Sequence, residues 1–261
     1  MNRSVVVTGS GKGIGRGIAE RLTADGWLVV GVERSPSDSV VAGVCAAVVL
    51  GDSAERATHT AAADRARALA PLAGWVNNAG ITRRTPLHEL DEETVRAVVE
   101  TNGLGYLWGC SAAVSAFVDQ TSGGSIVNVG SIHGRASFLD HAAYEFTKGG
   151  IDALSRSVAV SYGAYGIRAN TVAPGGVRTP HLEAQIASAP DPEAEERGLA
   201  DGPPLRRIAT VDEVASLVAY LLGDESGYIS GQSIAVDGAW TAAFGAPAPD
   251  AALDARYGVR R

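Results

Sequence analysis

The chain has 261 residues, of which 46% are hydrophobic and 20% are charged, and its formal net charge is −7 at pH 7. This composition is typical of a globular protein with a large core, most simply folded as one domain. The negative net charge argues against a surface that binds nucleic acid or an anionic membrane, because either would need a basic patch.

Short apolar runs alternate with longer amphipathic stretches along the whole chain. Strands are predicted at 3–8, 27–32, 44–50, 74–77, 125–130, 168–173 and 233–236. Helices are predicted at 13–25, 53–70, 91–118, 143–164 and 212–223. Several strands are almost entirely apolar, as expected of strands buried on both faces of a parallel sheet. The pattern predicts a single-domain, Rossmann-type α/β fold with a doubly wound parallel sheet of about seven strands.

Three segments depart from this alternation. Residues 35–43 are too few for a full crossover helix, so a loop is expected there. Residues 176–208 are rich in Pro, Gly and Ala, and we interpret them as a long loop that serves as a substrate lid within the domain of residues 1–245. Residues 246–261 form a Pro- and Ala-rich tail that we expect at a subunit interface, with Phe244, Leu253 and Tyr257 against a neighbouring subunit. Packing of the tail on its own subunit is the alternative.

A glycine-rich segment follows the first predicted strand and opens the first helix. Its glycines are Gly9, Gly13 and Gly15, with Lys12 and Ile14 between them. Glycines let the backbone turn tightly and approach a pyrophosphate, while the start of the helix supplies free N–H groups and positive potential. A purely structural glycine-rich helix start is the alternative. The position directly after the first strand favours a dinucleotide site.

The second strand ends at Glu33 and Arg34, where the adenine ribose of a dinucleotide would lie. A carboxylate at this point can accept both ribose hydroxyls and would repel a 2′-phosphate, which favours NAD. Arg34 and Lys12 favour NADP instead, since each could pair with that phosphate. We give Glu33 more weight, because an arginine can swing to solvent, and expect NAD.

Further polar turns follow the third and fourth strands. Asp52, with Ser53 beside it, could accept a hydrogen bond from the adenine amino group. Asn78, Ala79 and Gly80 form a small-residue turn at the edge of the sheet where ligands bind in such folds.

Together these segments resemble the short-chain dehydrogenase/reductase family over roughly residues 3–240. The resemblance rests on the glycine-rich segment, Asn77-Asn78-Ala79-Gly80, Asn102, Ser131, Tyr144 and Lys148, Pro174-Gly175 and the closing stretch 231–238. The chain has only two lysines, Lys12 and Lys148, and both lie in these motifs. No single motif is decisive, but their order and spacing are highly specific.

The resemblance implies a role for each matching residue. Tyr144 would be the general acid/base, and Lys148, one helical turn away, would lower its pKa and bind the nicotinamide ribose. Ser131 would donate a hydrogen bond to the substrate oxygen, and Asn102 would hold a water that links Lys148 to solvent. The nicotinamide would be held by Pro174, Gly175, Val177 and Thr179.

The substrate side is less specific. His133, Phe138 and His141 lie between Ser131 and Tyr144, where the pocket is expected. His133 could contact a polar substrate or, as the alternative we favour, bond to the backbone. Arg83, Arg84 and Arg178 lie on nearby loops, where arginines are usually solvated, although any of them could recognise a carboxylate.

Three functions follow from this reading. The first is an NAD(P)-dependent alcohol dehydrogenase or ketoreductase that acts on a secondary alcohol or ketone. The second is a 3-oxoacyl-carrier-protein reductase, which the stretch 78–83 resembles, although the stretch 119–122 and Tyr165 lack the basic residues that would dock an acidic carrier protein. The third is a non-catalytic dinucleotide-sensing scaffold, which would usually have lost Tyr144 or Lys148.

The expected partners and location follow from composition and from the resemblance. The two cysteines, Cys45 and Cys110, fit no metal or redox spacing, and we read them as small buried residues of a reducing compartment. With no signal-peptide pattern and no apolar run long enough to cross a bilayer, a cytoplasmic protein without a metal or a membrane partner is expected. The family resemblance implies a homotetramer with dihedral symmetry, in which helices 91–118 and 143–164 form one interface and the last strand with its flanking residues forms a second.

Overall fold

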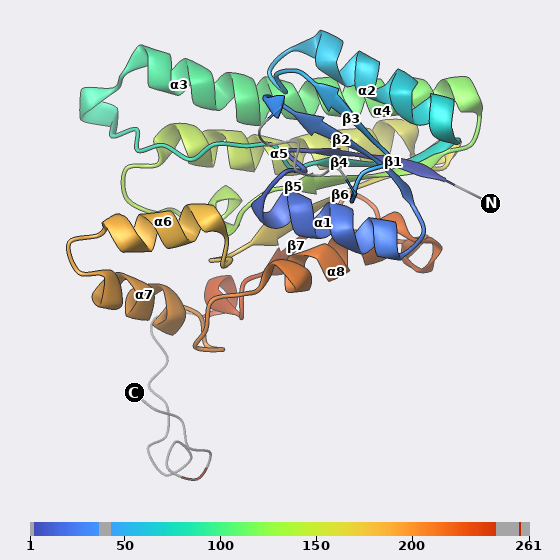
Figure 1. Ribbon diagram of the computed structural model, residues 1–261. Helices are drawn as coiled ribbons and strands as arrows, with labels where there is room; N and C mark the ends of the chain where they lie inside the picture. The colour runs from blue at the N-terminus through green and yellow to red at the C-terminus, as the bar shows by residue number, and fades with distance from the viewer. Residues whose placement is uncertain (1–2, 37–42, 244–255, 257–261) are drawn as a thin grey trace.

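Seven parallel strands form the centre of the computed structural model, in the order β3-β2-β1-β4-β5-β6-β7 (Figure 1). The strands are β1 (Ser4–Thr8), β2 (Leu28–Glu33), β3 (Ala47–Leu50), β4 (Leu72–Asn77), β5 (Gly124–Val129), β6 (Ile167–Pro174) and β7 (Ser233–Val236). The structure describes residues 3–36, 43–243 and 256. The predicted doubly wound sheet is confirmed. Strand order reverses between β1 and β4, and ligands of such sheets bind beside this reversal.

Helices cover both faces of the sheet (Figure 1). One face carries α1 (Gly13–Ala24) and α8 (Val211–Leu222), and the other carries α2 (Arg56–Leu69), α4 (Gly105–Gln120) and α5 (Ala142–Tyr162). Strand β1 supplies both cores, because successive side chains of a strand point to opposite faces. Val5 and Val7 pack towards α1 and α8, whereas Val6 packs towards α2 and α4.

The helix predicted at 91–118 is interrupted by a π-helical segment. It begins as α3 (Glu92–Val98), continues as a π-helix over Val99–Leu104, and ends as α4. A π-helix bonds each residue to the fifth rather than the fourth along the chain, so it holds an extra residue per turn, and such segments are frequent at functional sites. The predicted helical stretch is therefore present, with a π-helical segment in its middle that contains Asn102.

The stretch 176–208 is not a single loop. It contains α6 (Pro180–Ser188) and α7 (Pro192–Asp201), which lie together at one end of the molecule (Figure 1). Each helix has a proline at its first turn and a capping side chain before it: Thr179 accepts from the Leu182 N–H, and Asp191 accepts from the Ala194 N–H. Proline suits the first turn of a helix because its missing N–H would be unpaired there.

Other boundaries differ less from expectation. Strand β3 begins at Ala47 rather than at residue 44. Most of the predicted loop 35–43 lies outside the described residues, as do Phe244, Leu253, Tyr257 and all of the tail 246–261 except Arg256.

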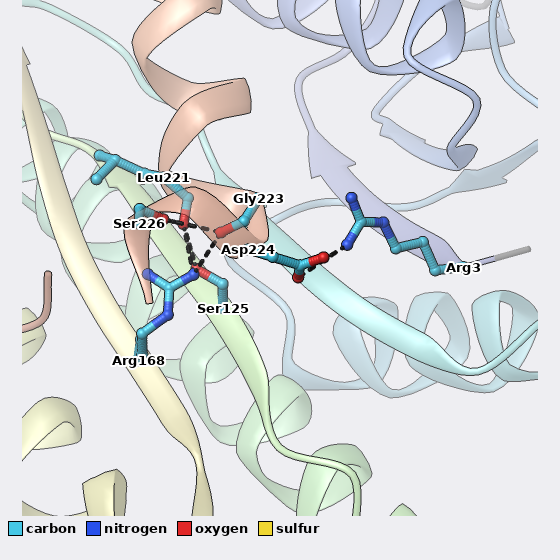
Figure 2. Close-up of polar contacts among 7 residues, drawn as sticks. All are labelled: Arg3, Ser125, Arg168, Leu221, Gly223, Asp224 and Ser226. Atoms are coloured by element: carbon cyan, nitrogen blue, oxygen red, sulfur yellow. Dashed lines mark hydrogen bonds and ion pairs between the residues drawn. The ribbon is translucent and has the colours of Figure 1, made fainter. Parts of the chain in front are cut away.

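A cluster of hydrogen-bond donors holds the C-terminal end of α8 against the sheet (Figure 2). Arg168 on β6 donates to the carbonyl oxygens of Leu221 and Gly223, at 3.0 and 3.1 Å. The hydroxyls of Ser125 and Ser226 also donate to the Leu221 oxygen, at 2.8 and 3.0 Å. The last carbonyls of a helix lack partners within the helix and carry partial negative charge, so a guanidinium and two hydroxyls satisfy them well.

We expect Arg168→Met to lower the free energy of unfolding by about 2 kcal/mol, because hydrogen bonds from a charged group to buried acceptors are lost. The matched control is Arg3→Met. Arg3 pairs with Asp224 at 3.3 Å on the surface nearby (Figure 2), where an ion pair contributes roughly 0–1 kcal/mol. Urea denaturation of the two variants measures both changes. Equal changes would mean that Arg168 does not anchor α8.

Candidate active site

Three segments converge at the carboxyl edge of the central strands. They are residues 9–15 after β1, residues 78–80 after β4 and residues 175–179 after β6. Gly9 has a φ of +67°, a left-handed conformation that favours glycine, and a Cβ atom on Gly15 would stand only 2.0 Å from the Gly9 carbonyl oxygen. Gly13 faces Thr179, whose methyl group is 3.5 Å from where a Cβ would lie. The positive φ angles of Gly9 and Gly13 and the close contact at Gly15 favour the predicted glycines, and the start of α1 that follows them suits a pyrophosphate.

Asn78 holds the start of the glycine-rich segment through its side chain and its backbone. Its side-chain amide donates to the carbonyl oxygens of Thr8 and Gly9, at 2.9 and 3.1 Å. The backbone N–H groups of Asn78 and Ala79 both donate to the Thr8 hydroxyl, at 2.9 and 3.0 Å. Asn78 is predicted to bind the cofactor, and its side chain in the structure holds the loop on which the cofactor would lie.

Glu33 at the end of β2 is buried, and its Oε1 accepts a hydrogen bond from the Ser10 hydroxyl at 3.0 Å. Ser10 belongs to the glycine-rich segment, so this bond joins two parts of the predicted adenosine site. Lys12 and Arg34 are both exposed. The carboxylate is thus held in place at this edge, while the two basic residues that would favour NADP extend towards solvent.

The turn after β3 forms the next part of this edge. Oδ1 of Asp52 accepts from the Ala54 N–H at 2.9 Å, so one carboxylate oxygen shapes the turn itself. The Ser53 carbonyl oxygen lies 2.8 Å from Nε2 of His59, a buried histidine of α2. Because the carbonyl can only accept, Nε2 carries the proton. Sequence reasoning missed His59, which holds the Ser53 backbone in position.

The segment predicted to grip the nicotinamide follows β6. Gly175 donates its N–H to the Val236 oxygen at 3.0 Å, and a short parallel bridge pairs Val177 with Ala209. That bridge uses the N–H of Arg178 and the carbonyl of Gly176, not the polar groups of Val177. The Val177 side chain is buried in the core, and Thr179 caps α6 with its hydroxyl as acceptor, which leaves that hydroxyl proton for another partner.

Lys148 is buried in α5 close to Tyr144. Its Nζ donates to the Val129 carbonyl oxygen at 2.9 Å and lies 5.4 Å from the centre of the Tyr144 ring and 5.2 Å from that of Tyr106. Burial lowers the pKa of Lys148 to about 7, because desolvation disfavours the charged form. The ammonium therefore changes charge near neutral pH.

The Tyr144 hydroxyl lies near two other hydroxyl groups. Burial raises the pKa of Tyr144, and hydrogen bonds with Ser131 and Thr82 oppose this rise. Lys148 is expected from the sequence to lower this pKa, whereas in this structure the net direction is upward and burial is the largest cause. Thr82 was not foreseen, and a threonine in a loop gives no signal in the sequence.

Asn102 is fully buried and fixes the loop that carries Thr82. Its Oδ1 accepts from the Ile81 N–H at 2.9 Å, and its Nδ2 donates to the Ile81 carbonyl at 2.8 Å. The amide thus pairs with both backbone polar groups of one residue, directly before Thr82. The π-helical segment places this side chain.

Three rings predicted to line the substrate pocket do gather beside Tyr144. The ring centres of His133 and His141 lie 5.6 and 6.5 Å from that of Tyr144, and Phe138 lies 6.0 Å from His133. Nδ1 of His133 is buried without a hydrogen bond and lies 3.5 Å from Oε1 of Glu145. Burial, the largest effect, lowers the pKa of His133. The favoured reading, a backbone-bonded His133 side chain, was wrong.

The nearby arginines are engaged in local contacts. Arg84 pairs with Asp140 and Arg178 pairs with Glu196, both at 2.5 Å. Arg83 donates to the carbonyl oxygen of its neighbour Thr82 at 2.8 Å. These contacts give little support to an arginine that recognises a substrate carboxylate.

Two findings concern the described residues as a whole. Among them, no helix combines the length and apolar character needed to cross a membrane, and no group of His, Cys, Asp and Glu side chains could hold a metal ion. Both cysteines are free thiols: Cys110 is buried and Cys45 is partly buried.

Comparison with known proteins places this chain in a family. A family model described as Enoyl-(Acyl carrier protein) reductase matches residues 9–241. The chain is 32% identical to 3beta-hydroxysteroid dehydrogenase 1 of Eggerthella lenta, over 92% of this chain and 94% of that one. It is also 32% identical to short-chain dehydrogenase/reductase ABA4 of Pyricularia oryzae, over 90% of both chains. The crystal structure of levodione reductase superposes with a TM-score of 0.87 at 28% identity, covering 93% of this chain and 98% of that one. The chain is therefore an enzyme of the short-chain dehydrogenase/reductase family.

Proposed function

We propose that this enzyme transfers a hydride between a nicotinamide cofactor and a secondary alcohol or ketone, with Tyr144 as the general acid/base. The observation that carries the proposal is the position of Tyr144 beside the buried Lys148, whose Nζ lies 5.4 Å from the centre of the tyrosine ring, with the hydroxyls of Ser131 and Thr82 near that of Tyr144. The relatives named above are a hydroxysteroid dehydrogenase and a levodione reductase, which fits this type of reaction.

The nicotinamide would supply or accept the hydride, and the protein's task is to orient the reactants and move a proton. In the direction of reduction, Tyr144 gives its proton to the substrate oxygen while Ser131 donates a hydrogen bond to the same oxygen. Lys148, whose pKa is about 7, stabilises the phenolate that remains and can itself exchange a proton at neutral pH. Asn102 holds the loop that presents Thr82.

A substrate panel tests this function. Secondary alcohols, polyols, hydroxysteroids and acyl thioesters are assayed with each cofactor by absorbance at 340 nm. Turnover of simple alcohols or ketones supports the proposal, and turnover of acyl thioesters alone would favour the 3-oxoacyl-carrier-protein reductase. Binding of the dinucleotide without turnover of any compound would favour the sensing scaffold.

We further propose that NAD is the preferred cofactor. Glu33 is buried where a 2′-phosphate would lie, and placing a phosphate dianion against a carboxylate is costly. Glu33→Ser is expected to narrow or reverse the ratio of kcat/KM for NAD⁺ to that for NADP⁺, because Arg34 and Lys12 could then pair with the phosphate. Equal use of both cofactors by the wild-type enzyme would contradict this prediction.

We propose a cytoplasmic homotetramer in which α4 and α5 pair with their copies in one neighbouring subunit and β7 with its flanking residues contacts another. Large apolar side chains remain exposed on α5 in the single chain: Phe146 is 73% exposed and Val160 is 85% exposed. Val160→Asp is expected to reduce the mass measured by light scattering, since a charge would be buried at the interface. Val160→Thr keeps the shape without the charge and serves as the control. An unchanged mass for Val160→Asp would exclude this face.

A further inference from the structure

Ser10 lies in the glycine-rich segment, yet its side chain is fully buried. Its hydroxyl donates to Oε1 of Glu33 at 3.0 Å. The backbone beside it is anchored as well, because the Gly9 N–H donates to the Val32 carbonyl at 2.9 Å. Both partners of the hydrogen bond therefore stand on segments that are tied to each other immediately next to it.

The strand below makes room for this contact. Gly31 lies two residues before Glu33 on β2, and a Cβ atom there would come within 2.3 Å of the Ser10 hydroxyl oxygen. The same Cβ would stand 3.1 Å from the Cys45 sulfur. Residues 31 and 33 share one face of the strand, so glycine at 31 provides the space that the serine hydroxyl occupies. The contact depends on two positions of the sequence besides Glu33.

We infer that Ser10 is a positioning residue for cofactor choice, which holds Glu33 where its carboxylate accepts the ribose hydroxyls and excludes a 2′-phosphate. The inference rests on the proposed role of Glu33. A carboxylate accepts several hydrogen bonds, so bonding Ser10 does not prevent bonding to ribose. A long side chain fixed in advance loses less conformational entropy on binding, and it cannot swing away to admit the phosphate.

The test measures dissociation constants for NADH and NADPH by nucleotide fluorescence, so it does not depend on finding the substrate. Ser10→Ala is expected to lower the ratio of the NADPH to the NADH dissociation constant about tenfold, the effect expected for a lost hydrogen bond to a charged group. Gly31→Ala places a methyl group against the same hydroxyl and is therefore also expected to lower the ratio. Ser226→Ala removes another fully buried serine hydroxyl, at the end of α8, and should leave the ratio unchanged.

A double-mutant cycle separates positioning from general damage to the loop. In a Glu33→Ala background, Ser10→Ala should no longer change the ratio, because the residue that Ser10 positions is absent. A change of equal size in both backgrounds would overturn the inference, as would a Ser10→Ala variant that weakens both nucleotides equally. Thermal unfolding of every variant identifies any that fail to fold, and Gly31→Ala then serves as the second route to the answer.

The outcome for the wild-type protein distinguishes the two proposals. A wild-type protein that binds neither nucleotide contradicts the proposed function, and one that prefers NADPH overturns the assignment of Glu33 and this inference with it. A wild-type protein that prefers NADH, with a ratio that Ser10→Ala leaves unchanged, overturns the role of Ser10 alone.

Discussion

Tyr144→Phe is expected to lower kcat by about 10²–10⁴-fold, since general acid/base catalysis typically contributes this much. The substitution removes only the hydroxyl that meets Ser131 and Thr82 and leaves the ring that packs against His133 and His141. Binding of the dinucleotide should therefore be nearly unchanged. Steady-state kinetics on an active alcohol or ketone, together with fluorescence titration of NADH, measures the two properties separately.

The control for this variant is Tyr162→Phe, which makes the same change near the far end of the same helix. It should keep kcat close to the wild-type value. If Tyr144→Phe retained more than about a tenth of kcat, proton transfer would have to be assigned to another group. A large loss of NADH affinity in Tyr144→Phe would instead indicate that the substitution had disturbed the site as a whole.

Lys148→Arg is expected to lower kcat/KM by at least about 100-fold, although the charge is formally conserved. Only 4% of Lys148 is exposed, and its compact ammonium fits between Val129, Tyr106 and Tyr144. A guanidinium is planar and larger, and it stays protonated at all relevant pH values, whereas the pKa of Lys148 is lowered to about 7. Activity near the wild-type level would show that a fixed charge alone is sufficient.

The same lysine should make the stability of the cofactor-free protein depend on pH. Its pKa is about 7 in the folded chain against an ordinary value of 10.5, so between these limits the unfolded chain binds the proton more tightly. The free energy of unfolding should therefore rise with pH across this window. Lys148→Met should weaken the rise and unfold at a higher urea concentration at pH 7, since the Tyr106 hydroxyl still donates to the Val129 carbonyl. Urea midpoints at pH 7 and pH 9 give both quantities.

The sequence predicted the sheet and much of the site because both depend on strong local patterns. Seven apolar runs separated by amphipathic stretches leave few alternatives to a parallel sheet. Gly9 and Gly13 have positive φ angles and Gly15 lies against the Gly9 carbonyl, so each position favours glycine, and Tyr144 and Lys148 lie one turn apart on α5 as expected. Each of these features is written in consecutive or regularly spaced residues.

The features that were missed depend on contacts between distant parts of the chain or on signals given too little weight. Thr82 meets Tyr144 across 62 positions of sequence, and nothing in its surroundings marks it. The hydrogen bond between Ser10 and Glu33 was missed for the same reason, since it joins residues 23 positions apart. The helices α6 and α7 did leave a signal, namely Thr179-Pro180 and Asp191-Pro192, each a capping residue followed by proline. Because proline is also common in loops, the same residues led to the prediction of a long loop over 176–208.

The π-helical segment at Val99–Leu104 sets the direction of Asn102 and also the direction of the outer face of α4. One residue of an α-helix corresponds to about 100° of rotation about its axis, so loss of a single residue from this segment would turn either Asn102 or the whole outer face of α4 away from its present direction. Asn102 must face Ile81, whereas Leu107 and Val118 must stay on the exposed side of α4. After a one-residue deletion, either the contact of Asn102 with Ile81 or the outward direction of Leu107 and Val118 would be lost. This part of the chain should therefore tolerate no change in length.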